Sequence, residues 1–339
     1  MSGSLNFICR VRCQALGIFN NANVSKISKI SQELWNFNKI GQAPHAPVDN
    51  LAAKWYYVCV LFMTKWLYKC IILEYMSICQ GVIPLEKKKM MHIGIGVGDV
   101  GRYVFLPGSP ERTEKIAKHF ENPKEIAYHR EYRTWVGTLD GVPVAVTSTG
   151  IGGPSTAIAV EELYQCGADT MMRVGSCAST SPKVCIGDIV IPSGAIRMEG
   201  VGDHYLPTEF PAVPDFQLMK VLEEAAIEKG YHYDIGVTIT KAGFYSQTAP
   251  QTKPIAQELM YRWDAYVKGG ATNTSMECAP LFLIAGTLGV RAASVMVSAT
   301  NYNDYSERGR TVPMSELEER VIEVAIEAMR KIIRKDQKG

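Results

Sequence analysis

Short runs of β-branched residues alternate with amphipathic stretches from about residue 100 onward, and this alternation constrains the fold more than any other feature. Runs such as 103–106 and 170–174 have the composition of buried strands, and the apolar spacing at 314–334 is that of a long helix. Chains with this alternation form α/β domains. The Asp140-Gly141 step between two strand-like runs predicts a hairpin, so we expect a mixed sheet.

The alternation continues without an internal repeat or a low-complexity linker, so we expect one domain at residues 91–335. Within it the pattern predicts further strands at 131–139, 142–148, 188–196, 235–240 and 292–298, and helices at 110–119, 154–165, 216–229 and 276–288.

Residues 1–90 form an atypical N-terminal extension. They carry 11 lysines and arginines against 4 acidic residues, whereas the rest of the chain carries 25 against 30. The first 37 residues contain one acid, Glu33, among basic residues, serines and asparagines, a composition typical of transit peptides. Alternatively, because Met90 and Met91 directly precede the domain, translation begins there and the upstream residues are a gene-model extension. Either way, we expect residues 1–90 to be poorly ordered.

An apolar run between Trp55 and Leu85 is interrupted by Lys65, Lys69 and Glu74. Its uncharged pieces reach about half of the ~20 residues that a spanning helix needs, so we expect no membrane association. The nine cysteines of the chain contain no CxxC pair and no zinc-type spacing, which fits free thiols and a cytoplasmic protein. The slightly acidic body has no basic cluster, so nucleic acid is not an expected partner and a small molecule is.

The segment Gly108-Ser109-Pro110-Glu111-Arg112 ends a buried strand with a glycine and begins a helix with a proline. Glycine lets backbone N–H groups approach an anion at the helix N-terminus, and an arginine adds a charged fork. This predicts a phosphate site; the alternative is an ordinary strand-to-helix turn with a solvated arginine.

A glycine-dense turn at 149–156 precedes the next helix, and it lacks the spacing of a P-loop or a dinucleotide fingerprint, so ATP and NAD are not indicated. The alternative explanation for the glycines of this turn is close packing of a helix on the sheet. Arg173 lies on a predicted buried strand and is followed by Gly175 and Ser176 at the carboxyl end of that strand, where α/β sheets hold ligands. A buried arginine needs a partner, which is either a ligand or a structural ion pair.

Glu277 stands at the head of an apolar helix. A carboxylate there can accept two sugar hydroxyls or, alternatively, complement the helix dipole.

Six segments, taken in order, resemble uridine phosphorylases and the hexameric purine nucleoside phosphorylases of the same family. They are Gly-Ser-Pro-Glu-Arg, His-Arg-Glu-Tyr, Ser-Thr-Gly-Ile-Gly-Gly-Pro-Ser, Arg-Val-Gly-Ser, Glu-Phe-Pro-Ala-Val and Ser-Met-Glu. The resemblance implies a single α/β domain whose central mixed, partly barrel-like β-sheet is flanked by helices. It also implies a homo-oligomer in which a dimer completes each site and three dimers form a hexamer.

The resemblance assigns roles to individual residues. It implies phosphate binding by Gly108, Arg112, Arg173 and Ser176, with Arg130 contributed by a neighbouring subunit. It implies ribose binding by Met276 and Glu277, with His92 contributed by the neighbour. A structural K⁺ between subunits would be held by Glu131, Ile151 and Ser155.

The implied activity is phosphorolysis, in which phosphate attacks C1′ of a nucleoside from the face opposite the base. Catalysis would rest on Arg173, Glu277 and Arg112, which position the reactants and stabilise charge while the glycosidic bond breaks with oxocarbenium character. Inorganic phosphate is the co-substrate, and no redox or nucleotide cofactor is required.

The resemblance implies base binding by Phe244, Gln247, Ala299 and Tyr302, but this part of the family pattern is only partly kept. Purine-specific members carry a Ser-Asp pair after the last strand, where this chain has Ser-Ala at 298–299. Uridine phosphorylases read the base with a glutamine and an arginine in a loop that begins Phe-Tyr; here Gln247 is present and that arginine is missing. A second expected arginine falls on Tyr302, and Ser275 replaces a glutamate near the ribose.

The missing aspartate favours cleavage of uridine to uracil and ribose 1-phosphate, a step of pyrimidine nucleoside salvage. A purine or modified-base nucleoside phosphorylase is the alternative. A non-catalytic nucleoside-binding or storage protein is a third hypothesis, which the retained arginines disfavour because unpaired buried charge is costly.

Overall fold

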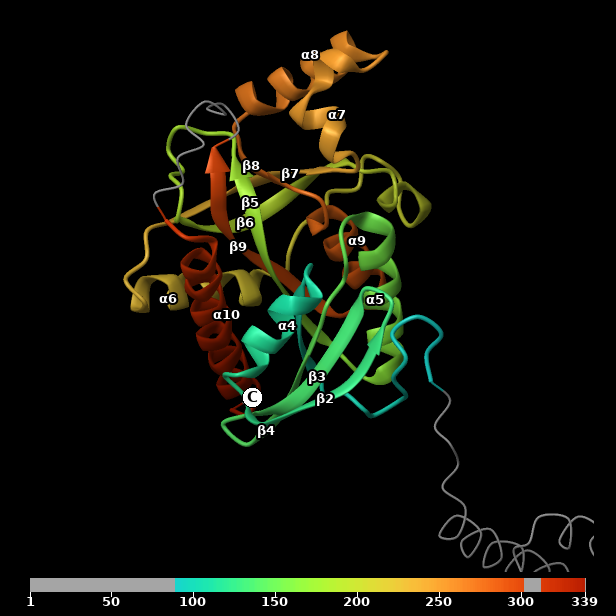
Figure 1. Ribbon diagram of the computed structural model, residues 1–339, viewed down its shortest axis with the longest axis vertical. Helices are drawn as coiled ribbons and strands as arrows, with labels where there is room; N and C mark the ends of the chain where they lie inside the picture. The colour runs from blue at the N-terminus through green and yellow to red at the C-terminus, as the bar shows by residue number, and fades with distance from the viewer. Residues whose placement is uncertain (1–88, 302–311, 339) are drawn as a thin grey trace, which may run out of the picture. The chain divides into compact units, whose positions relative to one another are not determined.

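The computed structural model describes residues 89–301 and 312–338. Nine strands form one sheet in the order β2-β3-β4-β1-β5-β8-β7-β6-β9, and β5 also pairs with β9, so the last five strands of this order close into a barrel (Figure 1). The expectation of a single-domain α/β fold with a mixed, partly barrel-like sheet is confirmed.

The strands are β1 (Tyr103–Pro107), β2 (Glu121–His129), β3 (Tyr132–Leu139), β4 (Val142–Thr147), β5 (Thr170–Ser179), β6 (Ile189–Met198), β7 (Tyr233–Lys241), β8 (Ala271–Ser275) and β9 (Arg291–Asn301). The α-helices are α4 (Pro110–Ala117), α5 (Gly153–Cys166), α6 (Phe216–Glu228), α7 (Phe244–Thr248), α8 (Ala256–Lys268), α9 (Cys278–Leu288) and α10 (Met314–Asp336), and the short 3₁₀ turns are η1 (Gly202–His204) and η2 (Pro250–Thr252).

The predicted hairpin joins β3 to β4. The two strands are antiparallel, and Leu139 pairs with Val142 across a turn in which Asp140 and Gly141 both have positive φ, 51° and 75°. Such a turn matches the twist of the paired strands. β1 runs parallel to both β4 and β5, so the sheet is mixed as expected.

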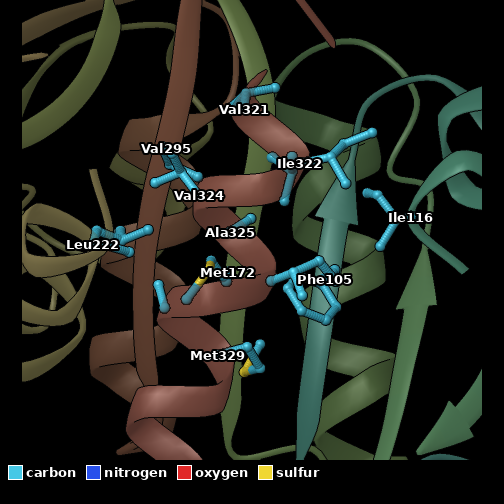
Figure 2. Close-up of a cluster of buried hydrophobic side chains, with 14 of the residues drawn as sticks. Phe105, Ile116, Met172, Leu222, Val295, Val321, Ile322, Val324, Ala325 and Met329 are labelled. Atoms are coloured by element: carbon cyan, nitrogen blue, oxygen red, sulfur yellow. The ribbon is translucent and has the colours of Figure 1, made fainter. Parts of the chain in front are cut away.

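Helices cover both faces of the sheet, and β1 shows how. Tyr103 and Phe105 belong to the core that contains α4, α6 and α10, whereas Val104 and Leu106 belong to the core that contains α5 and α9. Figure 2 shows residues of neighbouring strands packed against α10 in the first of these cores. Each fully buried valine, leucine, isoleucine, phenylalanine or methionine side chain there contributes about 1.5–3 kcal/mol to the free energy of unfolding. A polar side chain on β5, which lies between the two cores, must therefore find a partner in the protein or in a ligand.

Four elements were not expected from the sequence: β2, α7, α8 and β8. The first five residues of β2 are exposed and mostly polar, and β2 forms the edge of the sheet beside β3. The helix expected at 276–288 begins at Cys278, and β5 runs on to Ser179 instead of ending at Val174.

The expectations for residues 1–90 concern a segment of which the structure describes only Lys89 and Met90, so they stay predictions. In the described ranges, no helix is both long enough and apolar enough to cross a membrane.

Candidate active site

Arg173 and Glu277 form a buried ion pair beside the carboxyl end of β1. Nη2 of Arg173 contacts Oε2 of Glu277, and both side chains are 6% exposed. In the parallel register Arg173 lies opposite Leu106 of β1, and Glu277 directly precedes α9. The two residues that the sequence indicated separately, 104 positions apart, therefore meet at one point.

The guanidinium of Arg173 has N–H donors that form no hydrogen bond with a described residue. Nε and Nη1 are buried and have no hydrogen-bond partner. An unsatisfied buried donor costs about 1–3 kcal/mol, and a charged one more. An ion pair alone therefore does not account for this arginine, because two of its nitrogens remain available to an oxyanion.

Two glycines leave room around this guanidinium. A Cβ on Gly108 would lie 3.9 Å from Nη1 of Arg173, and one on Gly175 would lie 3.0 Å from Nη2. Gly108 also stands at the start of α4, whose first N–H groups are preceded by the N-cap Ser109. The free Nη1 thus faces the predicted phosphate loop, where the helix dipole also favours an anion.

The glycine-dense turn before α5 holds the carboxylate of Glu277. The backbone N–H of Gly152 donates to Oε1 at 2.9 Å, and the backbone N–H of Met276 donates to Oε2 at 3.2 Å. Although Glu277 occupies the N-cap position of α9, its side chain caps no N–H of that helix. The carboxylate instead reaches across to the start of α5, so complementing the dipole of its own helix is not its main role.

Arg112 of α4 is buried and bound to two other elements. Its Nη1 donates to the carbonyl oxygen of Val174 at 3.3 Å, and its Nη2 donates to Glu318 of α10 at 2.8 Å. Burial raises the pKa of Glu318, but hydrogen bonds from Lys115 and Arg112 outweigh it and hold that pKa below its ordinary value. The solvated-arginine alternative is therefore wrong. The Nε of Arg112 is buried without a partner, and Ser176 lies half-buried further along β5.

The residues predicted to hold a monovalent cation lie together. A Cβ on Gly150 would lie 2.8 Å from Cγ of Glu131 and 3.3 Å from Oγ of Ser155. Oγ of Ser155 in turn donates to the carbonyl oxygen of Ile151 at 3.3 Å. The turn at 149–156 therefore packs closely against Glu131, and it brings together a hydroxyl and a carbonyl oxygen, which are oxygen ligands of the kind that hard cations prefer.

The contacts of His92 and Arg130 involve neither Arg173 nor Glu277. Nδ1 of His92 lies 2.7 Å from Glu162, whose carboxylate also accepts the backbone N–H of Ile93. Arg130 is exposed in the turn between β2 and β3, with a φ of 56°, and forms no hydrogen bond or ion pair with another described residue.

Of the residues predicted to bind the base, Gln247 and Phe244 belong to α7. Gln247 is buried, with Nε2 lying 3.5 Å from Sδ of Met198, and Phe244 is half exposed and stacks edge-on against Tyr245 at 5.4 Å. Ala299 is buried in the core that contains α10, and Tyr302 lies outside the described residues.

Sequence reasoning missed Lys241, the last residue of β7. Its Nζ donates to Oγ1 of Thr274 at 3.1 Å and lies 5.7 Å from the ring centroid of Phe244. The expected strand ended at Thr240, which left this lysine in a loop. Continuing the two-residue alternation from Ile239 would have placed Lys241 on a buried face.

The structure thus combines a mixed sheet that closes into a barrel with a buried arginine–carboxylate pair at a glycine turn. The profile of the phosphorylase superfamily matches residues 102–335, and the chain belongs to this superfamily. The resemblance expected from the sequence is confirmed.

Three relatives show where in the superfamily the similarity lies. A uridine phosphorylase of Treponema pallidum is 42% identical over 245 residues, which are 72% of this chain and 95% of that protein. A uridine phosphorylase of Thermococcus kodakarensis is 43% identical over 231 residues, 66% of this chain and 82% of the relative. A guanosine phosphorylase of Halorubrum lacusprofundi is 31% identical over 221 residues, 65% of this chain and 87% of the relative.

Proposed function

We propose that the protein is a pentosyltransferase that cleaves uridine with inorganic phosphate to give uracil and ribose 1-phosphate. The observation that carries this proposal is the buried Arg173–Glu277 pair, in which the arginine keeps two donors without a partner. A phosphate oxyanion satisfies such donors, and the carboxylate is fixed where it can accept ribose hydroxyls.

The residues around Glu277 and Arg173 supply much of the positioning that this reaction needs. Gly152 and Met276 hold the carboxylate of Glu277 with backbone N–H groups, so little reorganisation is required when the ribose becomes cationic. Arg173 and Gly108 would orient phosphate toward C1′, and Arg112 supports them from α4. Phosphate serves as the nucleophile, and no further cofactor is needed for the bond exchange.

We infer a pyrimidine base from two observations. The Ser298-Ala299 pair offers no acid that could protonate a purine, and uridine phosphorylases are among the similar relatives. The guanosine phosphorylase keeps a purine nucleoside as the alternative substrate. A storage role is disfavoured because it gives no reason to keep a buried arginine with unsatisfied donors.

We also propose that Arg130 and His92 serve the site of a neighbouring subunit, in a dimer that assembles further into a hexamer. Arg130 supports this, since it is exposed and has no partner among the described residues of its own chain. A K⁺ ion held by Glu131, Ile151 and Ser155 would stiffen the adjacent turn. Four free cysteines, Cys166, Cys177, Cys185 and Cys278, fit a cytoplasmic enzyme of nucleoside salvage.

The test is release of free base from uridine, thymidine and inosine by the full chain, with and without phosphate. We expect uridine to be cleaved only when phosphate is present, with ribose 1-phosphate as the second product. Cleavage of inosine alone would support the purine alternative, and binding of nucleosides without cleavage would support the storage alternative.

A further inference from the structure

Lys241 is a buried cation that forms no ion pair with a described carboxylate. Its side chain is 5% exposed, and Nζ donates a hydrogen bond of 3.1 Å to the hydroxyl of Thr274 on β8. Burial of a lysine without a carboxylate partner is costly. A residue of this kind in the interior of an enzyme is therefore a candidate for a functional group rather than a structural one.

The charged neighbour of Lys241 is Glu277 of the candidate active site. Burial lowers the pKa of Lys241 to about 8, and the nearby charge of Glu277 opposes that shift. Cys177 on β5 is the second titratable neighbour, but burial raises the pKa of its thiol, so it stays neutral. Glu277 is already paired with Arg173, which leaves the ammonium of Lys241 free to act on a ligand.

The remaining contacts place Lys241 on the base side. Its Nζ lies 5.7 Å from the ring centroid of Phe244. In the β6–β7 register Lys241 pairs with Met198, and Sδ of Met198 lies 3.5 Å from Nε2 of Gln247. Lys241 is thus close both to the carboxylate predicted to hold the ribose and to Phe244, which is predicted to hold the base.

We propose that Lys241 contacts the nucleobase, donating a hydrogen bond to a pyrimidine carbonyl oxygen and stabilising the negative charge that develops there as the glycosidic bond breaks. The inference rests on the proposed function. Lys241 would supply the positive charge of the arginine that this chain lacks in the loop beginning Phe244-Tyr245.

The bond changes balance without a further reactant. A phosphate oxygen forms the new bond to C1′, and the electron pair of the C1′–N1 bond leaves with the base and spreads over its carbonyl oxygens. Lys241 keeps its proton throughout. The proton that hydrogen phosphate carried passes through solvent to the released uracil, leaving ribose 1-phosphate as the dianion.

The first test replaces Lys241 by methionine in the full chain and compares uridine with 5-fluorouridine. We expect kcat for uridine to fall about 100-fold, as when one preorganised donor is removed from developing charge. We expect a smaller loss with 5-fluorouridine, because its base is more acidic and leaves with less assistance. The KM for phosphate should not change. Equal losses with the two nucleosides would overturn the proposal.

Stability and a matched variant separate this effect from misfolding. Replacing an unpaired buried cation by an apolar side chain of similar length should keep or raise Tm. Lys229→Met, which removes an exposed lysine, should leave kcat for both nucleosides unchanged. A Lys241→Met protein that loses activity only because its Tm has collapsed would contradict the proposal.

The pH profile gives an independent measurement. In the wild type, kcat for uridine should fall as the pH rises through about 8, where Lys241 loses its proton. Lys241→Arg should move this alkaline limb to higher pH, because arginine stays charged. Identical alkaline limbs in the two proteins would overturn the inference while leaving the proposed function intact. Failure of the wild type to cleave uridine would instead overturn the proposed function, and this inference with it.

Discussion

The backbone N–H of Gly152 donates a hydrogen bond of 2.9 Å to the carboxylate of Glu277, although the two residues are 125 positions apart. The turn that starts α5 therefore fixes the acid that precedes α9. Because Gly152 has a φ of 92°, a conformation that side chains other than glycine rarely adopt, this contact depends on the glycine itself.

Glu277→Gln should affect catalysis and stability together. The amide keeps an acceptor for Gly152 but removes the charge that pairs with Arg173. We expect kcat for uridine to fall about 100-fold or more, and the free energy of unfolding to fall by about 3–5 kcal/mol because a buried arginine loses its counter-ion. Steady-state kinetics and urea denaturation measure the two effects.

Glu258→Gln is the matched control for this change, because it breaks an ion pair with Arg262 in which both side chains are about half exposed. Such a pair contributes about 0–1 kcal/mol, so the control should retain full activity and near wild-type stability. A Glu277→Gln protein as active and as stable as this control would contradict the assignment.

Gly175→Ala tests the space around the guanidinium of Arg173, which we propose binds phosphate. The added Cβ would lie 3.0 Å from Nη2 of Arg173, so the guanidinium must shift. We expect a KM for phosphate raised about 10-fold or more, because a small misplacement of a positioning group is costly. Gly286→Ala is the control, since an added Cβ would meet no atom within 4 Å apart from those of its chain neighbours and of its own helix backbone. In the interior of α9 this control should leave the KM unchanged and stabilise the protein by up to about 1 kcal/mol.

The buried strands could be predicted because their residues are apolar on both faces, as in β1 and β9. The sequence of β8, Ala-Thr-Asn-Thr-Ser, reads as a loop, yet four of its five residues are buried. Its strand conformation comes from β5 and β7, which pair with it on either side. Local propensity could not show this, since closure of the barrel is a tertiary effect.

Within the site, Arg173 could be selected because a buried arginine needs a partner, and Glu277 because sugar binding is one of two interpretations of a carboxylate at a helix start. Other residues of the site could not be predicted from the sequence. Glu318 reaches Arg112 from a helix 206 positions away, and Lys241 depends on one further residue of strand. Ordinary periodicity carries no signal for the contact between Glu318 and Arg112, whereas the burial of Lys241 follows from the strand alternation once the strand is extended by one residue.

Lowering the pH should destabilise the fold, partly because the carboxyl of Asp336 becomes protonated. Hydrogen bonds from Arg291 lower the pKa of this carboxyl, outweighing its burial, and the hydroxyl of Tyr103 adds a hydrogen bond of 2.8 Å. Since the folded pKa lies below the unfolded value of about 3.9, the stabilisation is complete above that value and is lost as the pH falls through the folded pKa.

Asp336→Asn should therefore lower the free energy of unfolding by about 1–2 kcal/mol at pH 7 and give a flatter dependence on pH below about 4. Urea denaturation between pH 2 and 7 measures both quantities. Asp264→Asn, at an exposed helix pair with Lys268, should follow the wild-type curve. An Asp336→Asn protein with the same acid dependence as the wild type would show that the Arg291 contact does not control this part of the profile.

Arg130 offers a test of whether one subunit completes the site of another. If Arg130 of one subunit serves the Glu277 of its neighbour, Arg130→Ala and Glu277→Gln homo-oligomers should both be weakly active. Co-expressed in equal amounts, the two chains form mixed dimers in which one site has both residues intact and the other has neither. Random pairing then restores about one quarter of the wild-type sites. A mixture whose activity equals the mean of the two separate variants would place Arg130 within its own subunit's site or outside the chemistry altogether.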